Sequence, residues 1–171
     1  MQTLLEFGLS LGSNLGDRVA TLARAKELIG AVDGVKVVSA SSLYETEPVG
    51  VKPEHQHLKY INAVLILNAR LAVEALHGIL TQIERQLGRV RGEDRYAPRT
   101  IDIDLLYAGK IVSDRPQLTL PHPRWAKRRF VLQPLAEIRG DLIMPGEAKT
   151  VRELLAALSP GEEVKKLTTG W

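Results

Sequence analysis

The sequence contains no cysteine, so disulfide bonds, thiolate nucleophiles and cysteine-ligated zinc are excluded. Aromatic residues make up only 5% of the chain, and no apolar run approaches the roughly 18 residues that a membrane-spanning helix needs. Residues 1–6 lack the basic start and the apolar stretch of a secretory signal. These absences favour a protein of the reducing cytoplasm, for which we expect no membrane partner.

Length and composition are those of a globular chain. The 171 residues fall within the usual size of one domain, and 44% hydrophobic with 25% charged residues suffices for a buried core. No internal repeat or low-complexity tract is visible, so we expect one domain over residues 1–171.

The net charge is only +3, but the basic residues are unevenly distributed. Arginine and lysine are concentrated in two short segments, residues 85–99 and 124–129. Because guanidinium groups form paired hydrogen bonds with phosphate and carboxylate oxygens, each segment is a candidate anion-binding loop. A solvated basic surface is the alternative interpretation of either segment taken alone.

Apolar periodicity predicts a mixed order of strands and helices. Strands are expected over residues 4–11, 35–44, 61–68 and 101–107, and helices over residues 17–29 and 76–87. This order is that of a ferredoxin-like α+β fold, an α/β sandwich with an antiparallel central sheet. Two more helices are expected over residues 131–138 and 151–158, and the loop over residues 45–59 has the length of a functional lid or a disordered segment.

The sharpest local signal is Ile-Asp-Ile-Asp-Leu at residues 101–105. Side chains alternate across a strand, so Asp102 and Asp104 face one side and the apolar residues face the other. Residues two apart along a strand are separated by about 6.6 Å, which lets both carboxylates serve one or two hard cations. An ordinary amphipathic strand is the alternative, although two aspartates on one face repel each other unless a cation is present.

The surroundings of the aspartates favour the metal site. The two arginine-rich segments precede and follow them, and carboxylates together with arginines are the groups that bind magnesium and a polyphosphate. His122, between two prolines and just before the second basic segment, is expected to contact phosphate rather than to act as a base. These features predict a magnesium- and nucleotide-dependent phosphoryl-transfer enzyme.

Other functions find less support. No Gly-x-x-x-x-Gly-Lys loop is present, so ATP would not be bound as in P-loop proteins. Residues 8–12 match a nucleophile-elbow pattern, but Ser10 lies inside a predicted strand with too few preceding residues for a serine hydrolase. An RNA-binding module of ferredoxin-like fold is supported by the basic loops and opposed by the scarcity of aromatic residues.

Six ordered blocks of the chain carry a resemblance to a known family. They are Leu-Gly-Ser-Asn-Leu-Gly-Asp at 11–17, Tyr-Glu-Thr-Glu-Pro-Val-Gly at 44–50, Tyr-Ile-Asn-Ala at 60–63, Ile-Glu and Gly-Arg at 83–84 and 88–89, Pro-Arg-Thr-Ile-Asp-Ile-Asp-Leu at 98–105, and Leu-Pro-His-Pro through Arg-Arg-Phe at 120–130. With these blocks, residues 9–145 resemble 6-hydroxymethyl-7,8-dihydropterin pyrophosphokinase (2-amino-4-hydroxy-6-hydroxymethyldihydropteridine diphosphokinase), an enzyme of tetrahydrofolate biosynthesis. The fifth block is highly specific.

The resemblance implies a single transfer in which the pterin hydroxymethyl oxygen attacks the β-phosphorus of ATP and AMP leaves. It further implies two magnesium ions on Asp102 and Asp104, with Arg89 and Arg99 as the catalytic arginines. The ATP contacts that it implies are Arg91, Leu105 through its backbone, Thr119, His122 and Arg128. The pterin contacts that it implies are Thr46, Val49, Asn62 and two aromatic residues that would stack on the ring, Tyr60 and Phe130.

The chain departs from the family pattern at two places. Ala97 stands where the family commonly has glycine before Pro98, so we expect a somewhat stiffer arginine loop. Residues 52–59 lack the usual acidic and proline residues, which leaves the details of the pterin-side lid open. We expect a cytoplasmic monomer that acts on these small molecules without a nucleic-acid partner. Because the chain ends soon after the resembling region, we expect no fused folate-pathway activity.

Overall fold

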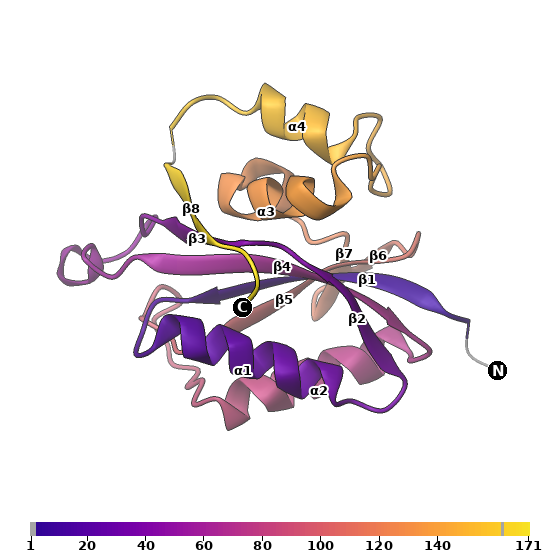
Figure 1. Ribbon diagram of the computed structural model, residues 1–171, viewed down its shortest axis with the longest axis horizontal. Coiled ribbons are helices and arrows are strands. Elements are labelled where there is room, and N and C mark those ends of the chain that lie inside the picture. The colour runs from indigo at the N-terminus through magenta and orange to yellow at the C-terminus, as the bar shows by residue number, and fades with distance from the viewer. Residues whose placement is uncertain (1–2, 162) are drawn as a thin grey trace.

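The computed structural model describes residues 3–161 and 163–171 of the chain. At its centre is an antiparallel sheet in which neighbouring strands follow the order β5–β1–β4–β3–β8, with β2 also paired to β4. Helices cover both faces of this sheet (Figure 1). Its strands are β1 (Leu5–Ser13), β2 (Val35–Ala40), β3 (Leu43–Thr46), β4 (Tyr60–Ala69), β5 (Asp102–Ala108) and β8 (Val164–Thr168).

The region from β1 to β5 confirms the expected ferredoxin-like α+β fold. Helix α1 (Arg18–Gly30) follows β1, helix α2 (Val73–Gln86) follows β4, and β1 and β4 pair at the centre of the sheet. The single strand expected over residues 35–44 is wrong in one respect, because it is divided into β2 and β3. At the division, the Ser41 hydroxyl accepts the Val64 N–H at 2.9 Å, so a side chain replaces one backbone acceptor of the ladder.

The second half of the chain adds elements to this unit. The two further helices that the sequence predicts are confirmed as α3 (Arg129–Arg139) and α4 (Val151–Ala157). Sequence periodicity did not reveal β8, which pairs with β3 at the edge of the sheet. It also missed a small hairpin and two short 3-10 helices, which are β6 (Ser113–Arg115), β7 (Leu118–Leu120), η1 (Pro53–His55) and η2 (Trp125–Lys127).

Alternation along the central strands divides the apolar side chains between two cores. Leu65 of β4 lies in the core that α1 and α2 cover, whereas Val64 and Ile66 lie in the core beneath α3 and α4. Figure 1 shows these two helix pairs on opposite sides of the sheet. The burial of successive side chains in different layers fixes the register of each strand, because a slip by one residue would exchange the two faces.

Local signals in the sequence set the start of two helices. The Asp17 carboxylate accepts the Ala20 N–H at 3.0 Å and caps α1, as expected for an acidic residue at a helix N-terminus. Thr150 and Glu153 form a reciprocal capping box at the start of α4. These caps satisfy backbone N–H groups that have no partner within the helix.

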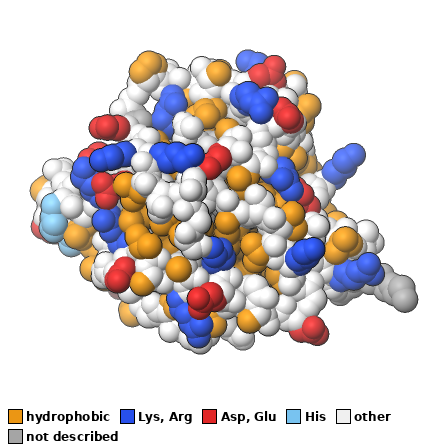
Figure 2. Space-filling model, viewed as in Figure 1, with side chains coloured by type: hydrophobic (Ala, Val, Ile, Leu, Met, Phe, Trp, Pro, Cys, Tyr) orange, Lys and Arg blue, Asp and Glu red, His pale blue; other side chains and the backbone are white. Residues whose placement is uncertain are grey.

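The surface does not present one continuous basic area on the side that Figure 2 shows. Lysine and arginine side chains are interspersed there with aspartate and glutamate. Within residues 3–161 and 163–171, no helix combines the length and the apolar character needed to cross a membrane. Residues 1 and 2, where the absence of a secretory signal was noted, lie outside the described ranges.

The packing of β1 against β5 generates a test of the fold. A Cβ atom at Gly8 would lie 2.2 Å from Cε1 of Tyr107, whose ring is buried and whose hydroxyl donates to Glu6 at 2.7 Å. We expect Gly8→Ala to lower the free energy of unfolding by about 1–3 kcal/mol, because the held ring cannot yield without strain.

Urea denaturation of Gly8→Ala and of a matched control measures this effect. At Gly78, inside α2, an added Cβ meets no atom within 4 Å, so Gly78→Ala is expected to stabilise the protein by about 0.5–1 kcal/mol. Equal stabilities of the two variants would contradict the packing described for Tyr107.

Candidate active site

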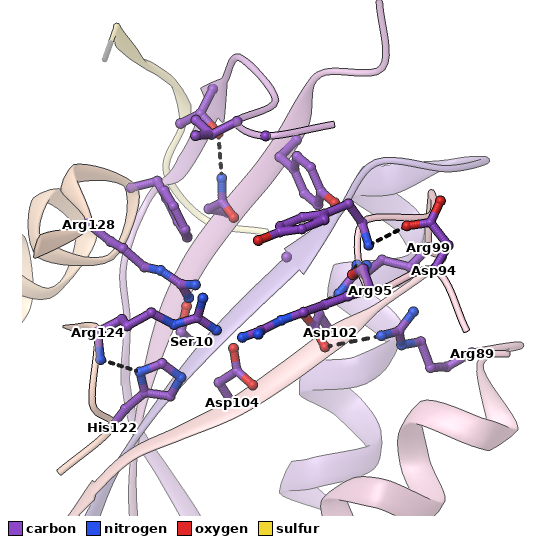
Figure 3. Close-up of a pocket in the computed structure, with 18 of the residues that line it drawn as sticks. Ser10, Arg89, Asp94, Arg95, Arg99, Asp102, Asp104, His122, Arg124 and Arg128 are labelled. Atoms are coloured by element: carbon purple, nitrogen blue, oxygen red, sulfur yellow. Dashed lines mark hydrogen bonds and ion pairs between the residues drawn. The ribbon is translucent and has the colours of Figure 1, made fainter. Parts of the chain in front are cut away.

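Helices α3 and α4 leave part of their face of the sheet uncovered, and a cavity of about 760 Å³ opens there. Its volume is within the range of small-molecule sites. Strands β1, β3, β4 and β5 supply its floor, and two segments supply its walls: the loop over residues 89–99, and residues 122–130, which include η2 and the start of α3. Figure 3 shows the guanidinium groups of Arg95, Arg124 and Arg128 directed toward the aspartates of β5, whereas Asp94 points away from them.

The floor of the cavity brings Asp102 and Asp104 together, as the sequence predicts. Both line the cavity, while Ile103 and Leu105 are buried in the core on the other face of β5. Antiparallel pairing places Gly12 beside Asp102 and Ser10 beside Asp104. These small residues of β1 leave room above the strands, so the space over the carboxylates stays open.

The two carboxylates have different surroundings. Asp102 is 3.1 Å from Nη1 of Arg99 and 3.9 Å from Nη2 of Arg89, whose side chains are both mostly buried. The side-chain carboxylate of Asp104 has no hydrogen-bond or ion-pair partner in the described part of the chain. Burial, with the charges of Asp102 and Glu84, raises the pKa of Asp104 to about 7. Asp104 is therefore a buried carboxyl group that no cation of the protein contacts directly, although several arginines line the same cavity.

A reciprocal pair of hydrogen bonds holds the arginine loop against the floor. The Arg99 N–H donates to Oδ1 of Asn14 at 2.8 Å, and the Asn14 N–H donates to the Arg99 carbonyl at 3.2 Å. The Arg99 guanidinium also donates to the carbonyl groups of Ala97 and Arg95. The side chain of Arg99 is thereby oriented toward the aspartates before any ligand binds.

Glu84 is a buried member of the site whose role the sequence did not reveal. Its carboxylate accepts the Ile103 N–H at 2.7 Å and lies 3.0 Å from Nη2 of Arg91. Burial raises its pKa, although these two donors favour the charged form. Glu84 fixes the backbone between the two aspartates from beneath, and its place in the sequence gave no sign of this contact.

His122 is held in one tautomer on the wall opposite the arginine loop. Its Nδ1 accepts the Arg124 N–H at 3.2 Å, so in the neutral ring the proton is on Nε2. Burial and the nearby guanidinium groups of Arg128 and Arg124 lower the pKa of His122 to about 4. The ring is thus a neutral hydrogen-bond donor, which is suited to a phosphate oxygen.

The other end of the cavity is less charged. Nδ2 of Asn62 donates to Oγ1 of Thr46 at 2.8 Å, and both side chains are buried. This hydrogen bond fixes the orientation of the amide, which leaves its oxygen available to a ligand. Val49 and two aromatic residues, Tyr60 and Phe130, also line this end.

Of the residues that the resemblance implied, the structure brings all but two to the cavity. Leu105 points into the core, and Thr119 lies in the β6–β7 hairpin, where its hydroxyl donates to the Arg115 carbonyl. The cavity also contains charged residues to which the sequence assigned no role. They are Glu47, Glu93, Asp94, Arg95, Arg124 and Lys127, and the clustering of arginines was the signal for two of them.

A carboxylate pair surrounded by arginines, beside a less charged pocket with two aromatic residues, is typical of enzymes that transfer a phosphoryl group from a nucleotide. Comparison with known proteins identifies the family. Residues 8–140 match the family model described as 7,8-dihydro-6-hydroxymethylpterin-pyrophosphokinase (HPPK), and the chain belongs to this family.

Relatives and solved structures agree with this membership. The chain is 46% identical over 153 residues to the 2-amino-4-hydroxy-6-hydroxymethyldihydropteridine pyrophosphokinase of Methylorubrum extorquens, covering 89% of this chain and 92% of the relative. The enzyme of the same name from Bacillus subtilis is 42% identical, covering 76% of this chain and 75% of the relative. A Plasmodium falciparum HPPK-DHPS structure matches with a TM-score of 0.72 at 14% identity, covering 91% of this chain and 43% of that longer chain, and this likeness shows the fold alone.

Family membership confirms the function that the resemblance implied. The enzymes of this family are ATP-dependent pyrophosphokinases that act on hydroxymethyl-dihydropterin in folate biosynthesis. The RNA-binding alternative is not favoured. The roles of individual residues do not follow from the comparisons and are taken up below.

The environment of His122 predicts its protonation state. We expect the imidazole to stay neutral from pH 8 down to about pH 5, because burial and two arginines oppose its charging. Since this pKa lies below the ordinary value of 6.5, the unfolded chain takes up the proton first. The stability contribution of the neutral ring is therefore complete above pH 6.5 and is lost as the pH falls toward about 4.

Nitrogen-15 NMR of histidine-labelled protein measures this prediction, with His122→Gln used to assign the resonance. The expected spectrum shows a protonated Nε2 and an unprotonated Nδ1 that do not change between pH 8 and pH 5. A midpoint near pH 6.5 would show that the ring is solvated and that the wall has a different structure.

Proposed function

We propose that the residues of this cavity carry out the pyrophosphoryl transfer of the family, with Asp102 and Asp104 as the metal ligands. The observation that carries this assignment is the placement of both carboxylates on the floor of one cavity, between two sets of arginines and beside the pocket of Asn62. Both reactants would therefore lie in the same enclosed space.

The side chains at the floor suit Mg²⁺ bound together with a polyphosphate. Among the described residues, no group of three acidic or histidine side chains could enclose a metal ion. Two carboxylates would leave the remaining positions to phosphate oxygens and water, which is how Mg²⁺ is usually bound at nucleotide sites. We propose two such ions; when bound, Mg²⁺ neutralises charge on the phosphates and orients their oxygens.

The arginines would supply the rest of the positive charge. Arg99 and Arg89 flank Asp102 and are placed to stabilise the group in transfer, while Arg91, His122 and Arg128 would contact ATP. Leu105, through its backbone, and Thr119 would lie beside the adenine; they are outside the cavity lining but on neighbouring strands.

The pterin would occupy the neutral end of the cavity. Tyr60 and Phe130 would stack on the two faces of its ring, which gain from aromatic contact. The Asn62 amide, held by Thr46, would hydrogen-bond the ring edge, and Val49 would pack beside it. In this arrangement the hydroxymethyl oxygen points toward the aspartates and attacks the β-phosphorus of ATP, and AMP leaves.

The enzyme as a whole follows from this assignment. We propose that the pyrophosphokinase domain spans residues 1–171 and that the protein works as a cytoplasmic monomer on ATP and 6-hydroxymethyl-7,8-dihydropterin. Catalysis would depend on positioning and charge neutralisation, because phosphoryl transfer needs little covalent chemistry from the protein.

The proposed reaction predicts a particular nucleotide product. Incubation of the protein with ATP, Mg²⁺ and the hydroxymethyl-dihydropterin is expected to give AMP and the pterin diphosphate in equal amounts, as measured by chromatography and mass spectrometry. Controls omit the pterin or replace Mg²⁺ with EDTA. Formation of ADP, or no turnover, would reject the reaction.

The metal assignment predicts that activity and stability respond differently to the same substitution. Asp102→Asn and Asp104→Asn are each expected to lower kcat by at least about a hundredfold, since each replaces a charged metal ligand with a neutral side chain of the same shape. Asp104→Asn is not expected to destabilise the metal-free protein, because it removes the repulsion between adjacent carboxylates.

Steady-state kinetics and urea denaturation in EDTA test both parts. Glu27→Gln is the matched control, since it neutralises an exposed carboxylate of α1 far from the cavity. Near-normal turnover in either aspartate variant would show that the metal is held elsewhere. A large loss of stability in Asp104→Asn would instead assign that carboxylate a structural role.

A further inference from the structure

Glu137 of α3 lies outside the cavity and accepts hydrogen bonds from residues at the junction of β2 and β3. Its Oε1 accepts the Ser42 hydroxyl at 2.6 Å, and its Oε2 accepts the Ser42 N–H at 3.0 Å and the Tyr44 hydroxyl at 2.7 Å. Lys166 of β8 adds an ion pair at 3.4 Å. One carboxylate of α3 is therefore bonded to two other segments of the chain.

The carboxylate of Glu137 has enough acceptor positions for all the donors around it, and its negative charge suits them. Burial opposes ionisation of Glu137, but the hydrogen bonds from Ser42 and Tyr44 outweigh it and lower the pKa of the carboxyl group. The ionised group only accepts hydrogen bonds, and its two oxygens can take all of these donors at once. Tyr44 is almost fully buried, so its hydroxyl would be left without this partner if the carboxylate were removed.

The two segments that Glu137 joins also form the neutral end of the cavity. On α3, Phe130 precedes Glu137 by seven residues, which is two helical turns, so both lie on one face of the helix about 10.5 Å apart. On β3, Tyr44 and Thr46 are two residues apart and face the same side of the sheet. Phe130 and Thr46 both line the cavity.

Apolar packing alone does not fix the position of α3 on the sheet. Leu132 and Leu135 pack against Val64 and Ile66 in the second core. Such contacts are non-directional, so a small shift of the helix along the sheet changes them less than it changes hydrogen bonds. Two sets of hydrogen bonds tie α3 to the sheet: Glu137 accepts from Ser42 and Tyr44, and Arg139 donates to Glu6 of β1 at 2.8 Å. Of the two, Glu137 is the one that ties the helix to β3.

We infer that Glu137 is a positioning residue for the pterin: it holds the helix that carries Phe130 at a fixed place relative to the strand that carries Thr46 and its partner Asn62. This inference rests on the proposed binding of the pterin between these walls. Glu137 touches neither substrate in this account, and it acts through the spacing of the residues that do.

The inference predicts a selective effect on pterin binding. Glu137→Gln keeps the shape of the side chain but loses its charge and one acceptor oxygen, and Tyr44→Phe removes a single hydroxyl group. We expect the KM for the pterin to rise about tenfold in Glu137→Gln and about threefold in Tyr44→Phe, with the KM for ATP changed by less than about twofold. The double variant should show less than the product of the two effects, because both act on one carboxylate.

The same exposed-carboxylate control, Glu27→Gln, is expected to leave all kinetic constants unchanged. An unchanged pterin KM in both variants would overturn the inference. So would an equal rise in both KM values, which indicates a change in the whole cavity, or a fall in kcat alone, which indicates a smaller folded fraction. If Glu137→Gln does not fold, Tyr44→Phe, which fills the same space, decides the question by the same criteria.

Calorimetry separates this inference from the proposed reaction. Pterin binding to the wild type and to both variants is measured in the presence of a non-hydrolysable ATP analogue, where no turnover occurs. Absence of AMP formation by the wild type would count against the proposed reaction. Equal pterin affinity in the wild type and both variants would count against the role of Glu137.

Discussion

The site depends on the alternation of side chains along β5. Ile103 and Leu105 are held in the core against α2, and this burial forces Asp102 and Asp104 onto the opposite face. Rotation of the strand would expose the apolar residues and bury the acids, so the hydrophobic core determines where the carboxylates point. The core thus holds the two carboxylates side by side although they repel each other, and a bound cation would reduce this repulsion.

Unequal coverage of the two faces of the sheet creates the space above those carboxylates. On one side α1 and α2 pack over the core (Figure 1), whereas on the other side α3 begins at the edge of the cavity, where its residue Phe130 is part of the lining. The small residues Ser10 and Gly12 keep the uncovered strands free of bulky side chains. The acids come from a strand and the cations come from the segments beside it, so the two kinds of charge in the site belong to different elements.

Much of this could be read from the sequence because it leaves a local trace. Periodicity located the main strands and helices, and the two-residue spacing of the aspartates predicted their common face. The division of one expected strand at Ser41, the edge strand β8 and the contacts of Glu84 and Glu137 leave no such trace. Each depends on hydrogen bonds between segments that lie far apart in the chain, and a glutamate on a helix looks the same in sequence whether it meets water or a buried N–H.

The two ends of the cavity are held by interactions of different strength. Buried hydrogen bonds hold the neutral end, where Glu137 joins α3 to β3. At the mouth, the loop after β3 meets the arginine loop through Lys52, which lies 2.9 Å from Asp94, and both side chains are partly or largely exposed. An exposed ion pair contributes at most about 1 kcal/mol, so the loops separate at little cost in free energy. Lys52 is the first residue of the segment 52–59, which departs from the family pattern. Its ion pair with Asp94 connects that segment to the arginine loop. The structure thus combines a neutral end fixed by buried hydrogen bonds, where we propose that the pterin binds, with a weakly fastened entrance beside the arginines.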